Sequence, residues 1–193
     1  NNEIYMNALM SNNGDAKWES FYYTITRCNT GIAKYPTIPS ILEAEYAPYV
    51  GQCYGMRAYM YFWATRVWGR LPLVTEEWGG SLDNIYVGRS SLEEVKAQIL
   101  SDITEAIRYF TISDPGSKYY LGEDAMRALL VEVYMWYGDY QEALDASEYF
   151  VGHNSLELVQ GEEEWKRIFT NPESSKEVIF SMAWDYETDG ALG

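Results

Sequence analysis

Apolar side chains recur at helical spacing along most of this chain, and glycine or proline separates the segments that carry the pattern. Two prolines in YPTIP (35–39) end the first long segment, and Gly69 and Gly138 end two later ones. Pro48 suits the first turn of a helix. The pattern therefore predicts a mostly helical protein. The expected helices cover 1–10, 18–34, 40–47, 48–68, 91–110, 122–137, 139–151 and 162–169, and EVIFSMAW (177–184) is expected to be a strand or an extended segment.

Polar pairs three residues apart predict where several of these helices begin. In a capping box, a Ser or Thr side chain accepts the third helical N–H, and a Glu at that third position returns a hydrogen bond to the cap. The pairs that fit or approach this pattern are Ser40 with Glu43, Ser91 with Glu94, and Asp139 with Glu142.

The helix expected at 48–68 is rich in aromatic residues, and its spacing predicts a buried face. That stripe consists of Met56, Tyr59, Met60, Trp63 and Val67, with Phe62 also expected in the core. Residues 70–90 lack helical spacing and contain glycine and proline, which predicts a long surface loop. Trp78 lies in this loop, with no helical face on which to be buried. It is either a lid over the core or a platform for a ligand.

Two parts of the sequence resemble each other and form an internal repeat. MRAYMYFWATRVWG (56–69) and MRALLVEVYMWYG (126–138) share their start, an aromatic helix and a final glycine. The second copy continues directly into DYQEALDASEYF and resembles a tetratricopeptide repeat, with Ala143 where only a small side chain lets two helices close. Ala106 is expected to play the same part in the first copy. We therefore predict an all-α, tetratricopeptide-like superhelix with helix pairs at about 48–110 and 122–151, the first interrupted by an inserted loop at 70–90.

Composition and charge narrow the range of functions. The 193 residues are enough for one domain of ordinary size. A formal net charge of −15 repels phosphate, which argues against nucleic acid and against anionic membrane surfaces as partners. No apolar run approaches the ~20 residues that span a bilayer, and no signal peptide or lipidation motif is present. With no initiator Met, the chain resembles a piece of a longer protein.

The two cysteines, Cys28 and Cys53, each lie inside an expected helix. Two are too few for a disulfide scaffold, and there is no CxxC motif for zinc or redox chemistry. They are either separate buried thiols or one bridge between neighbouring helices.

The sequence contains none of the common catalytic motifs. Its single histidine, His153, lies in the turn VGHNS without a nucleophile or metal-ligand partner at a recognisable spacing, and it is expected to be solvated. Acidic pairs such as Glu76 and Glu77 have the chemistry for glycoside hydrolysis, but nothing in the sequence makes two of them face each other. DYETD (185–189) lacks the spacing of a calcium loop. We therefore expect a binding protein with no enzymatic activity, cofactor or metal.

A longer pattern resembles a known family. GQCYGMRAYMYFWATRVWGRLPLV (51–74) is similar to the SusD/RagB signature G-E-A-x-x-x-R-A-x-x-Y-F followed by G-x-x-P-L. The matching positions are Gly51, Arg57, Ala58, Tyr61, Phe62, Gly69, Pro72 and Leu73. WESFYYTITRCN (18–29) resembles the family's W-x-x-x-Y-x-x-I-x-x-x-N helix, ILSDITEAI (99–107) its I-x-x-D-L-x-x-A helix, AMRALLVEVYMWYGDYQEA its second repeat helix and turn, and KEVIFSMAW its E-x-I-F segment. Gln52 departs from the usual Glu, which affects a polar contact rather than the fold.

The resemblance implies a function outside the cell. Proteins of the SusD/RagB family are outer-membrane lipoproteins that bind glycans at the cell surface and pass them to a TonB-dependent transporter. Their tetratricopeptide helices pack on the transporter, and a less regular region carries the sugar site. Family members are considerably longer, so residues 1–193 would form a single N-terminal helical domain without the lipid anchor and the C-terminal region.

The inserted loop is the candidate ligand site. Sugars stack their C–H faces on aromatic rings, and their hydroxyls bind amide, carboxylate and guanidinium groups. In relatives, the loop after G-x-x-P-L contributes to the ligand site, with residues that vary between members. The candidate ligand-binding residues here are Trp78, Asp83, Asn84, Tyr86 and Arg89. Arg89 has a second interpretation, because it directly precedes the Ser91 cap region and can hold the helix start. The alternative function is a protein-interaction or transporter-docking module that binds no sugar itself.

Overall fold

A computed structural model describes residues 6, 10, 13–14, 17–80, 86–152 and 155–182. Within these residues the protein is helical and has no β-strand, which confirms the predicted all-α fold class. None of the helices in this part of the chain is long and apolar enough to cross a membrane. The elements are α2 (Glu19–Lys34), η2 (Tyr35–Thr37), α3 (Glu43–Trp68), α4 (Leu92–Ile112), α5 (Glu123–Tyr137), α6 (Tyr140–Ser147), η3 (Glu148–Phe150), α7 (Glu162–Thr170) and η4 (Pro172–Ser174).

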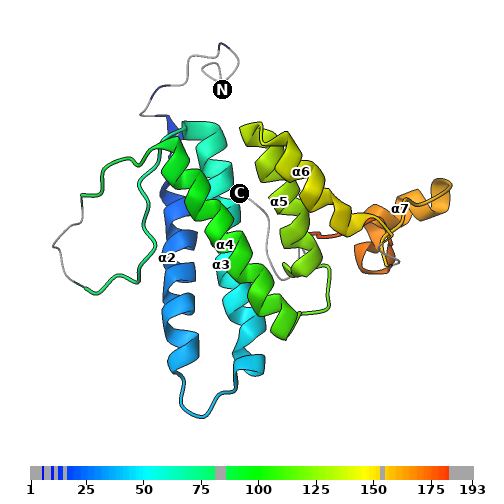
Figure 1. Ribbon diagram of the computed structural model, residues 1–193, viewed down its shortest axis with the longest axis horizontal. Coiled ribbons are helices and arrows are strands. Elements are labelled where there is room, and N and C mark those ends of the chain that lie inside the picture. Colours follow the sequence, from blue (N-terminus) through cyan, green and yellow to red (C-terminus); the bar gives the residue numbers. More distant parts are fainter. Residues whose placement is uncertain are drawn as a thin grey trace.

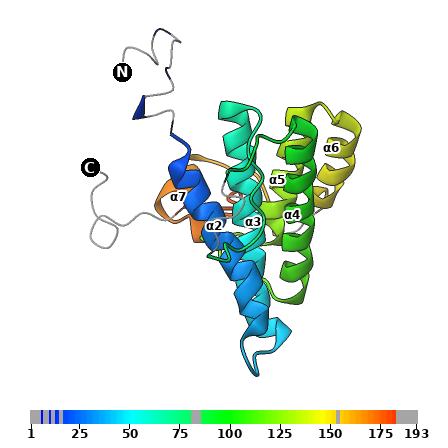
Figure 2. The same ribbon diagram turned by 90° about the vertical axis from the view of Figure 1, so that its left-hand side faces the viewer.

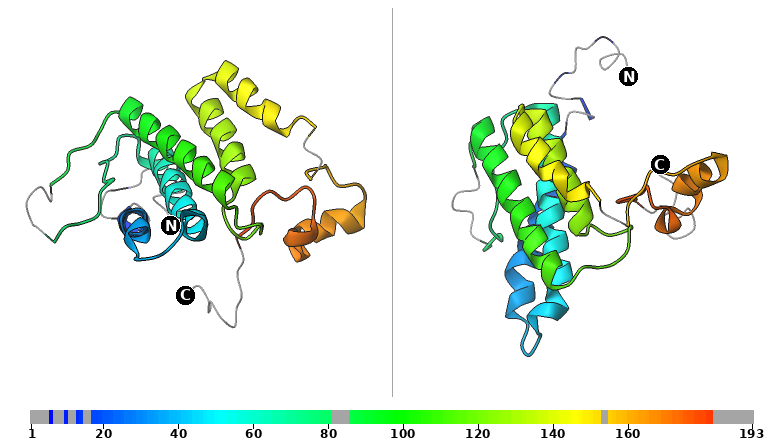
Figure 3. Two further views of the ribbon diagram at one scale, coloured as in Figure 1. Left: turned by 60° about the horizontal axis from the view of Figure 1, so that its bottom comes forward. Right: turned by 45° about the vertical axis from the view of Figure 1, so that its right-hand side comes forward.

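The helices stack largely in chain order. α3 packs between α2 and α4, α4 also contacts α5, and α5 pairs with α6. Figure 1 shows α2, α3 and α4 side by side, and Figure 2 shows α5 and α6 continuing the stack. The short helix α7 stands apart from the others, as Figure 3 shows. The core lies between α2, α3, α4 and α5, and its most deeply buried large residues include Ile25, Tyr61, Phe62, Ile99, Ile103 and Met126.

α3 is one continuous helix, which corrects the prediction of separate helices at 40–47 and 48–68. Ser40 has a positive φ of 65° and lies outside the helix, so the expected capping box of Ser40 and Glu43 is wrong. The helix begins at Glu43, and the Glu45 carboxylate accepts a hydrogen bond from the Leu42 N–H at 2.8 Å.

Pro48 lies inside α3 rather than at its first turn. Proline removes one helical hydrogen bond and usually ends or bends a helix. Here Ala47 and Val50, on either side of it, are fully buried with Tyr109 of α4. This packing keeps the helix continuous through the proline.

The predicted core stripe of α3 is only partly correct. Phe62 is buried, but Trp63 is 43% exposed and Val67 is 54% exposed. Met56, Tyr59 and Met60 are half-buried. Because α2, α4 and α5 contact α3 from different sides, its buried residues surround the helix instead of following one stripe.

The two predicted caps of the later helices have different outcomes. At α4 the capping box is confirmed, since the Glu94 N–H donates to Ser91 Oγ at 3.2 Å and the Ser91 N–H donates to Glu94 Oε2 at 2.7 Å. Asp139 precedes α6 but makes no side-chain cap hydrogen bond. Its carboxylate forms an ion pair with Lys96 of α4 instead, so it links the second helix pair to the first.

The remaining expected elements lie near the two ends of the chain. The described part of the expected strand, 177–182, is irregular, and its Ser181 N–H donates to the Lys118 carbonyl at 2.8 Å. The expected helix at 1–10 lies outside the described residues except for Met6 and Met10. His153 and the segment 185–189 also lie outside them.

Candidate functional site

The segment that joins α3 to α4, residues 69–91, contains the candidate site, and its described parts, residues 69–80 and 86–91, project from the side of the helix stack, as Figure 1 shows. Its two ends are held together beside the helices. The Ser90 N–H donates to the Leu71 carbonyl at 2.8 Å, and Arg70 Nη2 donates to the Arg89 carbonyl at 3.1 Å. Leu71 itself is fully buried. The segment is therefore a closed excursion from the core.

The stem of this excursion, residues 72–76, is fixed through its backbone by tyrosines of the core. The Tyr61 hydroxyl donates to the Val74 carbonyl at 3.1 Å and accepts from the Val74 N–H at 2.8 Å. The Tyr22 hydroxyl of α2 donates to the Pro72 carbonyl at 2.7 Å. Burial raises the pKa of Tyr61 to about 12, which keeps its hydroxyl proton available for this bond.

A buried polar network continues the attachment from α2 and α3. Asn29 Nδ2 donates to the carbonyls of Val74 at 2.8 Å and Glu76 at 3.0 Å. Arg57 Nη1 donates to Asn29 Oδ1 at 2.7 Å and to the Thr75 carbonyl at 2.9 Å. The network therefore gives partners to the carbonyls of Thr75 and Glu76 and a second partner to the carbonyl of Val74, so the buried backbone of the stem is satisfied.

Arg57 is itself held by Asp102 of α4. Its Nε and Nη2 donate to the two carboxylate oxygens of Asp102, at 2.8 and 2.6 Å, and Gln98 also donates to Asp102 at 2.9 Å. Arg57 and Asp102 are both buried. Burial alone would lower the pKa of Arg57, but the hydrogen bonds and charge of Asp102 outweigh it and raise that pKa. The pair therefore joins three helices and the stem through one permanently charged guanidinium.

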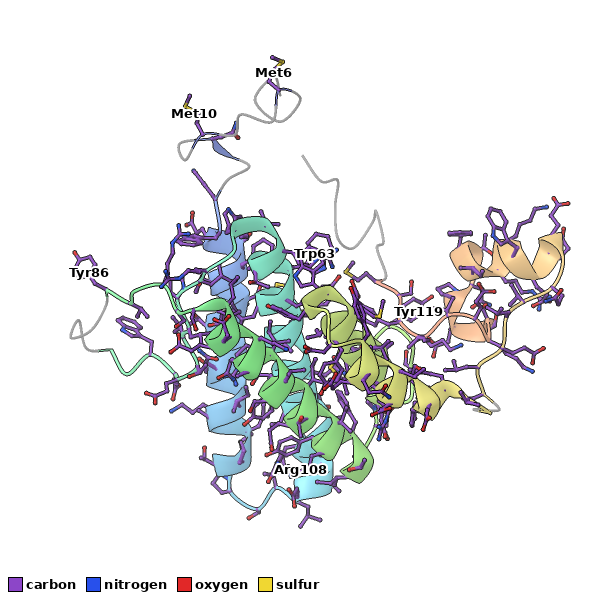
Figure 4. All side chains as sticks on the ribbon, turned by 45° about the horizontal axis from the view of Figure 1, so that its top comes forward. Met6, Met10, Trp63, Tyr86, Arg108 and Tyr119 are labelled. Atoms are coloured by element: carbon purple, nitrogen blue, oxygen red, sulfur yellow. The ribbon has the colours of Figure 1, made fainter. Side chains whose placement is uncertain are left out.

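The tip of the excursion is exposed. Trp78 is 65% exposed and Tyr86 is 94% exposed, and Gly79 and Gly80 beside Trp78 are exposed too. Figure 4 shows Tyr86 pointing away from the helices. In the described structure, two largely exposed aromatic side chains thus lie on a loop whose stem is hydrogen-bonded to the core.

The other predicted site residues have different positions. Asp83 and Asn84 lie outside the described residues. The guanidinium carbon of Arg89 lies 4.9 Å from the centre of the Trp18 ring, and its Nη1 donates to the Arg70 carbonyl at 3.4 Å. Arg89 therefore lies at the base of the excursion, against Trp18 and Arg70, at the opposite end from the exposed rings.

Three residues that determine the site's position were not predicted as functional: Asn29, Arg57 and Asp102. Each belongs to one of the sequence patterns through which the chain resembles the SusD/RagB family. Membership in these patterns is the feature of the sequence that could have identified them. Gln52, the departure from the signature, donates to the Leu121 carbonyl and accepts the Leu121 N–H at 3.1 Å. A Glu carboxylate cannot donate to that carbonyl, so this polar contact depends on the amide.

Other features of the described surface suggest no chemistry. No cluster of His, Cys, Asp or Glu suited to a metal occurs in the part of the chain that the structure describes. A pocket of about 320 Å³ lies where the α4–α5 connection meets residues 155–179, and Lys118, Asp124 and Tyr149 are among its lining residues. None of the predicted site residues lines it.

Comparison with known proteins places these features in a family. Residues 2–135 match a family model, SusD-like, described as "Starch-binding associating with outer membrane". A SusD-like protein of Formosa agariphila is 33% identical over 182 residues, which cover 90% of this chain and 35% of that protein. The chain thus spans about a third of the length of this relative.

Solved structures agree with the fold. A SusD superfamily protein of Bacteroides vulgatus aligns with a TM-score of 0.72 and 29% identity, over 90% of this chain and 37% of the other. A laminarin-binding SusD-like protein aligns with a TM-score of 0.69 and 25% identity, over 80% of this chain and 34% of the other. With its motif residues gathered in one buried network and most of its length matched by the family model, the chain belongs to the SusD-like family.

Proposed function

We propose that this chain binds an oligo- or polysaccharide through the tip of the 69–91 excursion. The observation that carries the proposal is the pair of exposed aromatic residues, Trp78 and Tyr86, on a loop whose stem is fixed by Asn29 and Arg57. A rigid stem reduces the entropy lost when a ligand binds, and exposed rings offer the apolar face on which a sugar stacks. Asp83 and Asn84, between the two rings in sequence, are the proposed hydrogen-bonding residues.

The comparisons support a glycan as the ligand class. The family description names starch, and one structurally similar protein is a laminarin-binding protein. The net charge of −15 favours a neutral glycan over an acidic one. In this proposal the protein acts at the outer face of the outer membrane, to which a lipid anchor outside this chain attaches it, as a single helical domain without catalytic activity. It delivers the glycan to a TonB-dependent transporter.

Substitution of the tip tests the proposal directly. Trp78→Ala should weaken binding of laminarin, or of another neutral polysaccharide from a panel, by about tenfold or more in calorimetry, because a stacking surface is lost. The melting temperature should not change, since the ring is exposed. Trp165→Ala on α7, which removes another exposed Trp away from the excursion, is the matched control. Unchanged affinity in Trp78→Ala with a collapsed melting temperature would make Trp78 a structural lid and refute the site.

A second function is supported by a different surface. Trp63 of α3 and Trp136 of α5 are both partly exposed, and the guanidinium carbon of Arg66 lies 5.4 and 5.0 Å from their ring centres. Aromatic rings around an arginine are typical of protein interfaces. If neither Trp78→Ala nor Tyr86→Ala changes glycan binding or stability, a protein-interaction role that includes transporter docking without sugar binding becomes the better explanation.

A further inference from the structure

The two cysteines are neighbours in space although they lie on different helices. Cys28 of α2 and Cys53 of α3 are both free thiols, and their side chains are hydrogen-bond partners. A Cβ added to Gly31, in the same turn of α2 as Cys28, would lie 2.5 Å from Cys53 Sγ. Cys53 therefore reaches the backbone of α2 beside Cys28, and any side chain at position 31 would force the Cys53 thiol to move.

The two thiols differ in access and in acidity. Cys28 is buried, whereas Cys53 is half-buried and lines a surface pocket of about 350 Å³ together with Arg27 and Lys34. The hydrogen bond with Cys28, aided by the charge of Arg57, lowers the pKa of Cys53, while that same bond and burial raise the pKa of Cys28. A thiolate, not a thiol, attacks a disulfide. Cys53 is thus the thiol that an external reagent reaches first.

We propose that Cys28 and Cys53 form a redox-active dithiol, which a small organic disulfide oxidises to a disulfide that links α2 to α3. The Cys53 thiolate attacks one sulfur of the external disulfide, forms a mixed disulfide and releases one external thiolate. Cys28 then gives its proton to solvent and attacks Cys53 Sγ, which expels the second external thiolate. The two cysteines lose two protons and two electrons, and the external disulfide becomes two thiols.

The position of this pair gives the reaction a structural consequence. Asn29, directly after Cys28, donates to the Val74 and Glu76 carbonyls of the excursion stem. Oxidation would attach α2 covalently to α3 at the point where both helices hold that stem. The link would also constrain the unfolded chain, which raises stability. This inference is independent of the proposed function, because it concerns the chain with or without a glycan.

The test incubates the reduced chain with oxidised glutathione and measures intact mass and free thiols after denaturation. We expect wild type to lose both thiols and two hydrogen atoms in mass, with a higher melting temperature that dithiothreitol reverses. Cys28→Ser should stop at the mixed disulfide and gain one glutathione on Cys53. Cys53→Ser should keep an unmodified Cys28, because that thiol is buried.

Two results would overturn the proposal. One is wild type that keeps both thiols under conditions in which Cys28→Ser becomes glutathionylated. The other is wild type that retains a glutathione adduct or forms disulfide-linked dimers, because either product means that Cys28 does not reach Cys53 Sγ. The wild-type mass decides the question even if a serine variant folds poorly, and circular dichroism checks the fold of each variant.

Discussion

The two helix pairs of this molecule, α3–α4 and α5–α6, are built on one plan with one large difference. In each pair a glycine with positive φ ends the first helix, Gly69 at 71° and Gly138 at 81°. In each pair the second helix buries an alanine, Ala106 or Ala143. The α5–α6 pair turns back at once, whereas α3 and α4 are separated by residues 69–91. The two glycines differ in ψ, which is −118° at Gly69 and 14° at Gly138, so the chain leaves them in different directions.

The difference shows what a long excursion requires of a core. At the tight turn, backbone groups satisfy one another, since the Asp139 N–H donates to the Tyr134 carbonyl at 3.0 Å. At the excursion, the backbone of the stem depends on side chains of three helices, including the buried ion pair of Arg57 and Asp102. The first helix pair therefore has charged and polar groups in its interior that the second does not need at its turn.

The largest expected effect comes from breaking the network that only the first pair has. Arg57→Met should lower the free energy of unfolding by about 3–5 kcal/mol, because it leaves the Asp102 carboxylate buried without its partner. Urea denaturation measures the loss. Arg66→Met is the control, since its ion pair with Glu132 is partly exposed and should contribute about 0–1 kcal/mol. Equal losses in the two variants would show that the stem does not depend on the buried pair.

The same substitution at the two turn glycines sharpens the comparison. Gly138→Ala should cost about 1–2 kcal/mol, because a left-handed helical conformation is unfavourable but accessible to alanine. Gly69→Ala should cost more, about 2–3 kcal/mol, because its φ and ψ lie in a region that side chains rarely enter. Thermal melting of both variants ranks them. A larger loss at Gly138 would contradict the difference in backbone geometry, since an added Cβ meets no atom within 4 Å at either position.

Overpacking tests the closeness of the second pair. Ala143→Leu should destabilise the protein by about 1–3 kcal/mol, because Ala143 is buried where α6 meets α5. Ala33→Leu, at an exposed position of α2, adds the same atoms without a neighbour and serves as the control. A chemical denaturation midpoint that moves equally in both variants would mean that α6 does not pack tightly at this residue.

The smallest effect concerns the hydroxyl that binds the stem. Tyr61→Phe should lower stability by about 1 kcal/mol, since its two hydrogen bonds to Val74 are lost. Burial raises the Tyr61 pKa from 10.0 to about 12, so the unfolded chain loses this proton first. The contribution is complete below pH 10 and is lost as pH rises to 12. Tyr61→Phe should flatten the fall of unfolding free energy in that window; an unchanged slope would assign the fall to other tyrosines.

The parts of the fold that local sequence determines were the parts that could be predicted. The Ser91–Glu94 box fixes the start of α4 through neighbours in sequence, and Gly138 fixes the end of α5 in the same way. The start of α3 depends on burial of Ala47 and Val50 against a distant helix, which no local pattern contains. The prediction that Trp63 is buried was wrong for a similar reason. The spacing of apolar residues along a helix does not show how many other helices pack against it.

The candidate site shows the same distinction between features set by local sequence and features set by tertiary packing. The lack of a helical face left two positions open for Trp78, a lid over the core or a ligand platform, and the structure leaves its side chain 65% exposed. The support beneath it joins Asn29, Arg57 and Asp102 across three helices, and such an arrangement depends on tertiary packing. All three are pattern residues of the family resemblance, but no role in the site was predicted for them from the sequence.

The stem's hydrogen bonds have a consequence for how this protein can diversify. Asn29, Tyr61, Tyr22 and Arg57 all bind main-chain atoms of residues 72–76, and none of these bonds involves a stem side chain. Every amino acid has the same carbonyl group and all but proline have the N–H that Val74 donates, so substitutions along residues 73–76, other than proline at position 74, leave these hydrogen bonds in place. The side chains of this segment can therefore change with little effect on folding. Ligand specificity can then change during evolution while the helical scaffold stays the same.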